Sequence, residues 1–370
     1  MKNTIRAAFA ANPVIDRRRL LLGTGATAAA LALAGCTDAD SDAGSTAGSA
    51  EGSATAGAAT TRTETVALRY GYTATNSDLL TGIVGLAHDL GYLDEALAEV
   101  NATFEAVGFT KAGPAINSAL AAGELELGGL GDVPAISAKA SGAETTLIST
   151  TFNVYYTEIV VPADSEVESL EDLKGKTIAV QTGSYMQRIL YQILEANDIS
   201  VDEVEIANMA EVDAATAIAG GSVDAAPLSS FKALKLTLAG DARSIYSTDG
   251  VDAQRALSTT LARTDFAEEY PDVLVAFFEG VIRAEQYVEV NGVEELRQQY
   301  IDTGVDEAII DAALDDDEDY ITTLYTSDEK VDLLQDAATQ LVDYGLLETE
   351  VDVYAWFDGS FYEEAAEALA

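Results

Sequence analysis

Several residue types on which chemistry depends are nearly absent from this sequence of 370 residues. It contains one cysteine, Cys36, and one histidine, His88. No disulfide can therefore form within one molecule, and the histidine and cysteine clusters of many catalytic and metal centres cannot be assembled. His88 lies next to Asp89 in a helical pattern, where we predict a partly exposed structural residue. We expect no cofactor, no metal ion and no enzymatic activity.

Basic residues are also scarce. Lysine and arginine total 20 against 63 aspartates and glutamates, which gives a net charge of −43 and an isoelectric point near 4.1. Nucleic-acid binding is excluded, because no basic patch exists to displace counterions. Hydrophobic residues still make up 48% of the chain, so the acidity belongs to the surface of a folded protein rather than to a disordered one. Such a surface is typical of high salt, where the Debye length falls to ~3 Å, and it predicts a halophilic, archaeal protein.

No hydrophobic run is long enough to span a bilayer. The apolar stretch 20–34 has about 15 residues where a spanning helix needs about 20. Arg17, Arg18 and Arg19 precede it, so residues 1–35 are predicted to be a signal peptide. Its end, Leu33-Ala34-Gly35-Cys36, resembles a lipobox, and we expect Cys36 to carry a lipid. The paired arginines resemble a twin-arginine export signal, with Sec export as the alternative.

Residues 36–63 are rich in serine, threonine, alanine, glycine and aspartate, and cannot bury a core. They are predicted to be a disordered tether with a reach on the order of 25 to 30 Å. Asp38, Asp40 and Asp42 alternate as in a calcium loop, but Gly44 falls one place late and Ser49 stands where the closing glutamate should be. We therefore predict no calcium site here.

Beyond the tether, short β-branched runs alternate with helical patterns. This order predicts parallel sheets covered by helices on both faces. The alternation restarts after Glu158, as though in a second lobe, and long helical patterns follow the last predicted strand. We expect an α/β fold with two lobes and a double crossover between them: residues 64–157 plus 256–370 form lobe 1 with a helical tail, and residues 158–255 form lobe 2. The clearest predicted elements are strands at 65–72, 145–151, 158–162, 177–180, 223–226 and 256–262, and helices at 79–100, 185–197, 213–219 and 229–238.

Three segments, in the same order along the chain, resemble the periplasmic sulfonate-, taurine- and nitrate-binding proteins of ABC importers. The resemblance covers residues 65–260 and, more loosely, the helical tail. The segments are Phe109-Thr110-Lys111-Ala112-Gly113-Pro114 with its continuation through Gly131-Asp132-Val133-Pro134, then Leu170-Glu171-Asp172-Leu173-Lys174-Gly175-Lys176, and Ala217-Ile218-Ala219-Gly220-Gly221-Ser222-Val223-Asp224-Ala225.

The resemblance implies a periplasmic-binding-protein fold of type II, whose two lobes close on a ligand by hinge motion. It further implies a monomeric solute-binding lipoprotein on the outer face of the cell membrane. That protein would capture a small anion, such as a sulfonate, taurine or a nitrate-like ion, and deliver it to an ABC permease. Sulfonate-binding relatives carry Trp-Asp-Pro after the last strand of the second lobe. This chain has Pro227-Leu228-Ser229-Ser230 there, which leaves the solute open.

In open α/β sheets, ligands bind beyond the carboxyl ends of the strands, where helix N-termini offer free N–H groups and a positive dipole end. Ser77, Asp132 and Ser184 could instead merely cap their helices. Arg188, one turn into its helix, could pair with an anion or face solvent. The predicted ligand-binding residues are Thr73, Thr75, Asn76, Ser77, Gly131, Asp132, Thr182, Gly183, Ser184, Tyr185 and Ser229.

Two other functions fit the same resemblance. The first is transport of a neutral heterocycle, such as a thiamine-pyrimidine or flavin precursor, stacked on Tyr155, Tyr156 and Tyr185. The second is an enzyme like the pyrimidine synthases of thiamine metabolism, which share the fold. That chemistry needs a reactive histidine and a cysteine cluster, and the chain has one residue of each type.

Overall fold

The computed structural model describes residues 62–74, 77–314, 320–321 and 326–370. The predicted signal peptide, Cys36 and nearly all of the predicted tether lie outside the described residues. Within the described ranges, no helix is both long and apolar enough to cross a membrane.

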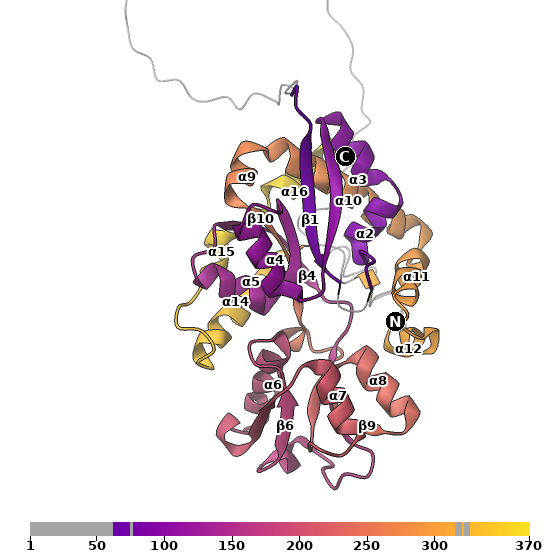
Figure 1. The fold of residues 1–370 in the computed structure, drawn as a ribbon, viewed down its shortest axis with the longest axis vertical. Coiled ribbons are helices and arrows are strands. Elements are labelled where there is room, and N and C mark those ends of the chain that lie inside the picture. Colours follow the sequence, from indigo (N-terminus) through magenta and orange to yellow (C-terminus); the bar gives the residue numbers. More distant parts are fainter. Residues whose placement is uncertain (1–61, 75–76, 315–319, 322–325) are drawn as a thin grey trace, which may run out of the picture. The chain divides into compact units, whose positions relative to one another are not determined.

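Lobe 1, as we call the unit around the larger sheet, is built on five strands in the order β2-β1-β3-β10-β4 (Figure 1). Strand β1 runs parallel to β2 and β3, whereas β10 is antiparallel to β3 and β4. The expectation of purely parallel sheets is therefore wrong, because β10 comes back from the second lobe and enters the sheet from the opposite end. The strands are β1 (Val66–Thr73), β2 (Ala102–Phe109), β3 (Leu127–Gly131), β4 (Thr145–Phe152) and β10 (Leu257–Arg263).

Lobe 2 contains the elements between β4 and β10 (Figure 1). Strand β5 pairs antiparallel with both β8 and β9, and β6 pairs parallel with β7. The sequence pattern did not predict β9, whose short polar run Ala242–Ser247 shows no clear alternation. The strands are β5 (Thr157–Pro162), β6 (Thr177–Val180), β7 (Glu205–Asn208), β8 (Ala226–Ser229) and β9 (Ala242–Ser247), and the helices are η3 (Leu170–Leu173), α6 (Tyr185–Ala196), η4 (Val201–Glu203), α7 (Glu211–Ala219), α8 (Ser230–Ala239) and η5 (Asp252–Gln254).

The first helical segment of lobe 1 differs from the prediction. Instead of one helix over 79–100, the chain forms α2 (Gly82–Asp89) and α3 (Tyr92–Glu99). Gly82 and Gly91 have φ values of +75° and +76°, which glycine adopts without steric cost and which interrupt a right-handed helix. Apolar residues recur at helical spacing on both sides of Gly91, so the sequence pattern did not indicate that the helix is interrupted there.

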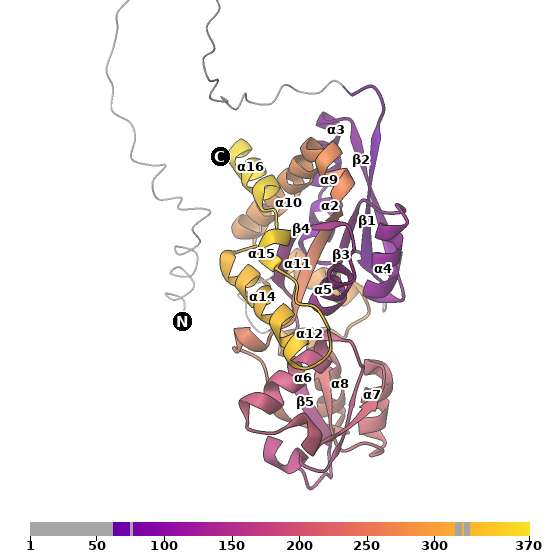
Figure 2. The same cartoon turned by 90° about the vertical axis from the view of Figure 1, so that its left-hand side faces the viewer.

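The C-terminal helices complete lobe 1. The long α10 packs against α2, α3 and α16, and α14 packs against β4, α5 and α6 (Figure 2). Phe277, Phe278 and Trp356 are at most 4% exposed, so these aromatic rings serve packing rather than ligand stacking. The remaining helices of the described residues are α4 (Ala112–Ala121), α5 (Asp132–Ala140), α9 (Thr264–Glu269), α10 (Pro271–Asn291), α11 (Glu294–Asp302), α12 (Glu307–Ala313), α14 (Asp328–Asp343), α15 (Val353–Trp356) and α16 (Ser360–Ala368).

Candidate ligand-binding site

The first predicted helix end, around Thr73 and Ser77, is not a helix end in the structure. Thr73 is the exposed last residue of β1, and Thr75 and Asn76 lie outside the described residues. The hydroxyl of Ser77 accepts a backbone N–H two residues on, at 3.1 Å, while α2 begins further along the chain. Ser77 therefore caps no helix, because the predicted helix 79–100 starts one turn late. A binding role for these four residues stays a prediction.

The second predicted end is the junction of β3 with α5. Gly131 closes the strand and is the N-cap of the helix. Asp132 is the first residue of α5 and is 0% exposed. One carboxylate oxygen, Oδ1, accepts the N–H of Val133 at 2.7 Å. The other, Oδ2, accepts the guanidinium of Arg188 at 2.7 Å.

This Arg188–Asp132 pair joins the two lobes, since Arg188 lies in the first turn of α6 in lobe 2. Its side chain is 2% exposed and also donates to the carbonyl of Arg255 and to Oε1 of Gln340, each at 3.3 Å. The alternative in which Arg188 faces solvent is therefore wrong. Its anionic partner in this structure is the carboxylate of Asp132. The sequence analysis considered Arg188 and Asp132 separately, whereas in the structure their charges neutralise each other.

The third predicted end, at α6, has the expected local geometry. Ser184 is the N-cap, and its Oγ accepts the N–H of Gln187 at 3.3 Å. Gly183 has φ +74°, and its N–H donates to Oε1 of Gln187 at 2.7 Å. The N–H of Thr182 donates to Asn208 at 3.0 Å. An anion that binds here would have to replace these two amide side chains as acceptors.

Aromatic rings connect the two lobes close to these ends. Tyr185, the first residue of α6, has its ring centroid 6.4 Å from that of Tyr155 on the connection between β4 and β5. Tyr155 in turn contacts Phe231 of α8 at 6.0 Å, and Phe231 contacts Tyr300 of α11 at 6.1 Å. Burial raises the pKa of Tyr155 to about 12, with the charge of Glu211 as the next cause. The hydroxyl of Tyr155 is therefore neutral near pH 7 and can donate or accept a hydrogen bond. Of the three tyrosines predicted to stack, Tyr156 forms none of these ring contacts, and its carbonyl accepts the N–H of Ser230 at 2.8 Å.

Ser229 ends β8 and is the N-cap of α8, and it is 5% exposed. Its N–H and its hydroxyl both donate to Oε1 of Glu211, at 2.8 and 2.6 Å. Lys232 of α8 pairs with the other oxygen of Glu211 at 2.7 Å. Sequence reasoning missed Glu211 and Lys232. The same rule could have found Glu211, because it is the first residue of α7, the helix that follows β7.

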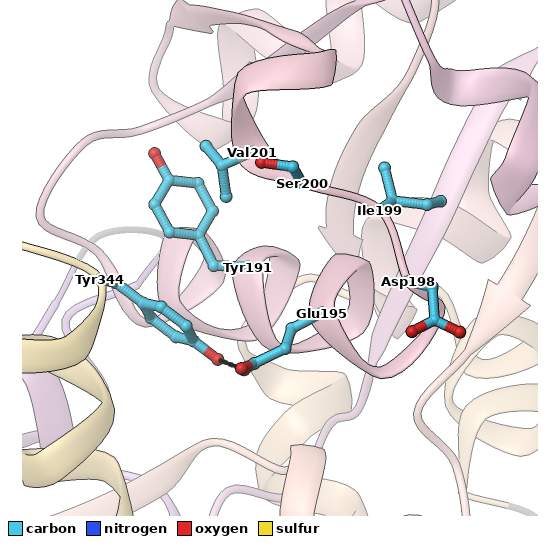
Figure 3. A pocket seen from close by; sticks show the side chains of 7 residues that line it. All are labelled: Tyr191, Glu195, Asp198, Ile199, Ser200, Val201 and Tyr344. Atoms are coloured by element: carbon cyan, nitrogen blue, oxygen red, sulfur yellow. Dashed lines mark hydrogen bonds between the residues drawn. The ribbon is translucent and has the colours of Figure 1, made fainter.

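A surface hollow of about 290 Å³ lies elsewhere, beside the C-terminal half of α6 (Figure 3). There the hydroxyl of Tyr344, which follows α14, donates to Glu195 of α6 at 2.7 Å. Burial and this bond raise the pKa of Tyr344. The hollow contains none of the predicted site residues, and its lining consists of Tyr191, Glu195, Asp198, Ile199, Ser200, Val201 and Tyr344.

Comparison with known proteins shows which family this chain resembles. The family model described as NMT1/THI5 like matches residues 86–295. A protein of Escherichia coli (strain K12) named for binding aliphatic sulfonates is 30% identical over 172 residues, which are 46% of this chain and 52% of that protein. The match thus spans about half the length of that relative. A Bacillus subtilis (strain 168) protein of the same name is 26% identical over 292 residues, or 76% of this chain and 84% of that protein.

A solved structure shows the fold. The periplasmic sulfonate-binding protein SsuA of a sulfonate ABC transporter from Methylobacillus flagellatus KT superposes with a TM-score of 0.72 at 23% identity, covering 83% of this chain and 95% of that chain. The predicted α/β fold of the periplasmic-binding-protein type is therefore confirmed. Because the family model spans more than half of the chain, and includes the starts of α5, α6, α7 and α8, this protein is a member of the NMT1/THI5-like family.

Proposed function

We propose that this protein binds a small oxyanion of the sulfonate class and delivers it to the permease of an ABC importer, without chemical change to the solute. The observation that carries the proposal is the meeting of helix N-termini from both lobes. The first residue of α5, Asp132, is bonded to Arg188 in the first turn of α6. Helix α5 follows β3 directly and α6 follows β6 after the turn 181–184, so both ends lie where ligands bind in open α/β folds. The names of the two curated relatives support a sulfonate.

The proposal is tested by calorimetric titration of the purified protein in molar salt with taurine, alkanesulfonates, nitrate and thiamine precursors. We expect one site per molecule that takes an alkanesulfonate or taurine with a Kd of about 1 μM or below, or ~8 kcal/mol and more. The proposal is wrong if no oxyanion in the series binds at millimolar concentration.

A neutral planar heterocycle is the second candidate, and the ring contacts of Tyr155 favour it. Tyr155 lies between Tyr185 and Phe231, each from a different helix of lobe 2. Aromatic faces in such an arrangement can stack on a planar ligand. In the same titration, binding of a thiamine precursor without binding of any sulfonate would establish this alternative.

We also propose that the protein is exported, anchored by a lipid on Cys36, and acts as a monomer on the outer face of the cell membrane. The lipobox-like Leu33-Ala34-Gly35-Cys36 after the arginine-led apolar stretch supports this. Cys36→Ser should release the protein into the medium or leave an unprocessed precursor, measured by fractionation and mass. Unchanged membrane retention and processing would contradict lipid anchoring.

A further inference from the structure

The N-terminal end of α8 holds a carboxylate that belongs to the chain. Oε1 of Glu211 receives the N–H and the hydroxyl of Ser229, and Oε2 lies 2.7 Å from the ammonium of Lys232. The hydroxyl of Ser229 accepts no capping bond from α8, and its proton is donated to Glu211. The side chains of Glu211 and Lys232 are 23% and 28% exposed. The carboxylate is thus held by an N–H, an O–H and an ammonium at a helix N-terminus.

These contacts are the ones that proteins offer to bound oxyanions. Charge-assisted hydrogen bonds from N–H and O–H groups, a nearby cation and the positive end of a helix all favour a negatively charged group. Helix α8 spans ten residues, from Ser230 to Ala239. Its first N–H groups have no acceptor within the helix, and that of Ser230 donates to the carbonyl of Tyr156 at 2.8 Å.

A second hydroxyl at this helix end, that of Ser230, forms no hydrogen bond with Glu211. Ser230, the first residue of α8, is 0% exposed, and its hydroxyl has no hydrogen-bond partner among the residues that the structure describes. A buried hydroxyl that makes no hydrogen bond is rare and costly. Ser230 follows Ser229 at the same helix end, and its hydroxyl is a donor that Glu211 does not use.

The surroundings connect this end of α8 with the candidate site. Phe231, the second residue of α8, contacts the ring of Tyr155. The charge of Glu211 is also among the causes that raise the pKa values of Tyr155 and Tyr185, after burial. Glu211 therefore lies within electrostatic range of the aromatic rings that join the lobes.

We propose that the N-terminal end of α8 is an oxyanion seat for the sulfonate group of the ligand, and that Glu211 is a built-in competitor that occupies it in the absence of ligand. The inference rests on the proposed function. When a sulfonate enters, the side chain of Glu211 turns out toward solvent, and the sulfonate takes the donors of Ser229, Ser230 and Lys232. Competition from Glu211 weakens the affinity of the protein for anions. A simple oxyanion therefore binds poorly, and only a ligand that makes further contacts with the protein binds well.

The test uses methanesulfonate, the smallest sulfonate, in calorimetric titrations of the full chain at one fixed molar salt concentration. Glu211→Ala empties the seat, and it should tighten methanesulfonate binding about ten- to a hundredfold, the effect of one or two charge-assisted hydrogen bonds. Adding Ser230→Ala to that variant should weaken binding again about five- to thirtyfold. The matched control is Glu171→Ala, which removes another lysine-paired carboxylate of lobe 2, bonded to Lys174 at 2.9 Å, and should leave the affinity unchanged. Thermal melts show whether each variant is folded.

The outcomes separate the inference from the proposed function. Equal affinity in the wild type and in Glu211→Ala, or no binding in either, overturns the seat. Weaker binding in Glu211→Ala also overturns it, because Glu211 would then contact a cationic part of the ligand. If the wild type binds none of the sulfonates in the series but Glu211→Ala binds methanesulfonate through Ser230, the seat stands and the proposed function fails.

Discussion

At the scale of single residues, the Arg188–Asp132 pair is a buried ion pair that joins the two lobes. Both side chains are at most 2% exposed. Burial of two charges costs desolvation, which their attraction offsets only when both are present. Arg188→Met leaves Asp132 buried without its cation, and we expect a loss of about 3 to 5 kcal/mol in the free energy of unfolding. Urea unfolding in molar salt measures this.

The control for this variant is an exposed pair. Lys174→Met breaks the contact of Lys174 with Glu171, whose side chain is 70% exposed, and should cost far less than Arg188→Met because solvent screens the pair. Equal losses in the two variants would show that the buried pair contributes no more than a surface one.

Lys330 makes the stability depend on pH. Its side chain is 8% exposed, and burial, followed by the charge of Arg255, lowers its pKa from 10.5 to about 8. Between these values the unfolded chain binds more protons than the folded one, so the free energy of unfolding should rise with pH across this window. As pH falls from 10.5 to about 8, the free energy of unfolding decreases, because the unfolded chain takes up a proton more readily than the folded one. Below about pH 8 Lys330 is charged in the folded protein as well, and the full cost of burying that charge is present.

Lys330→Met should therefore be more stable than the wild type at pH 7, by about 1 to 3 kcal/mol, and should lack the rise. Urea unfolding from pH 7 to pH 10 measures both effects. The exposed Lys235 of α8 provides a control, because Lys235→Met should keep the wild-type slope. If the wild type and Lys330→Met show parallel curves, Lys330 is not responsible.

At the scale of elements, the packing of α10 on α3 depends on Gly280. A methyl group there would lie 2.8 Å from Cδ2 of Leu93 and 3.0 Å from its Cα. In an open helix position, glycine to alanine stabilises by about 0.5 to 1 kcal/mol. Here the sign should reverse, and Gly280→Ala should cost about 1 to 3 kcal/mol because backbone atoms cannot move aside cheaply.

A thermal melt with calorimetric detection tests this packing. Val290, in the same helix and 82% exposed, offers a control: Val290→Ala should change the stability by no more than about 0.5 kcal/mol. A Gly280→Ala variant that melts at or above the wild-type temperature would show that α10 has room at this point.

At the scale of the whole molecule, the net charge of −43 should make the stability depend on salt concentration. At 1 M salt, repulsion between surface carboxylates is screened within ~3 Å, whereas at 0.01 M it extends to ~30 Å. We expect the melting temperature to fall by roughly 5 to 10 °C between these conditions, or about 2 to 4 kcal/mol. KCl in place of NaCl at equal ionic strength should change it little. A melting temperature independent of salt would remove the argument for a halophilic surface.

Much of the fold could be predicted because periodicity and caps are local. The strand predicted at 177–180 is β6, and the helix predicted at 185–197 begins at Tyr185 after the N-cap Ser184. The direction of β10 and the pairing of β9 could not be predicted. They depend on how the chain crosses between lobes, and nearby residues carry no signal for that.

The sequence by itself determined the family, the acidic surface and the helix ends at Asp132, Ser184 and Ser229, because each is a property of composition or of a few consecutive residues. Only the tertiary structure decided what those ends meet. Asp132 meets Arg188 from the other lobe, and Ser229 meets Glu211 from the neighbouring helix. Residues far apart in the chain become partners because of packing and because a buried charge needs a counter-charge. A few consecutive residues do not indicate which distant residue that partner is.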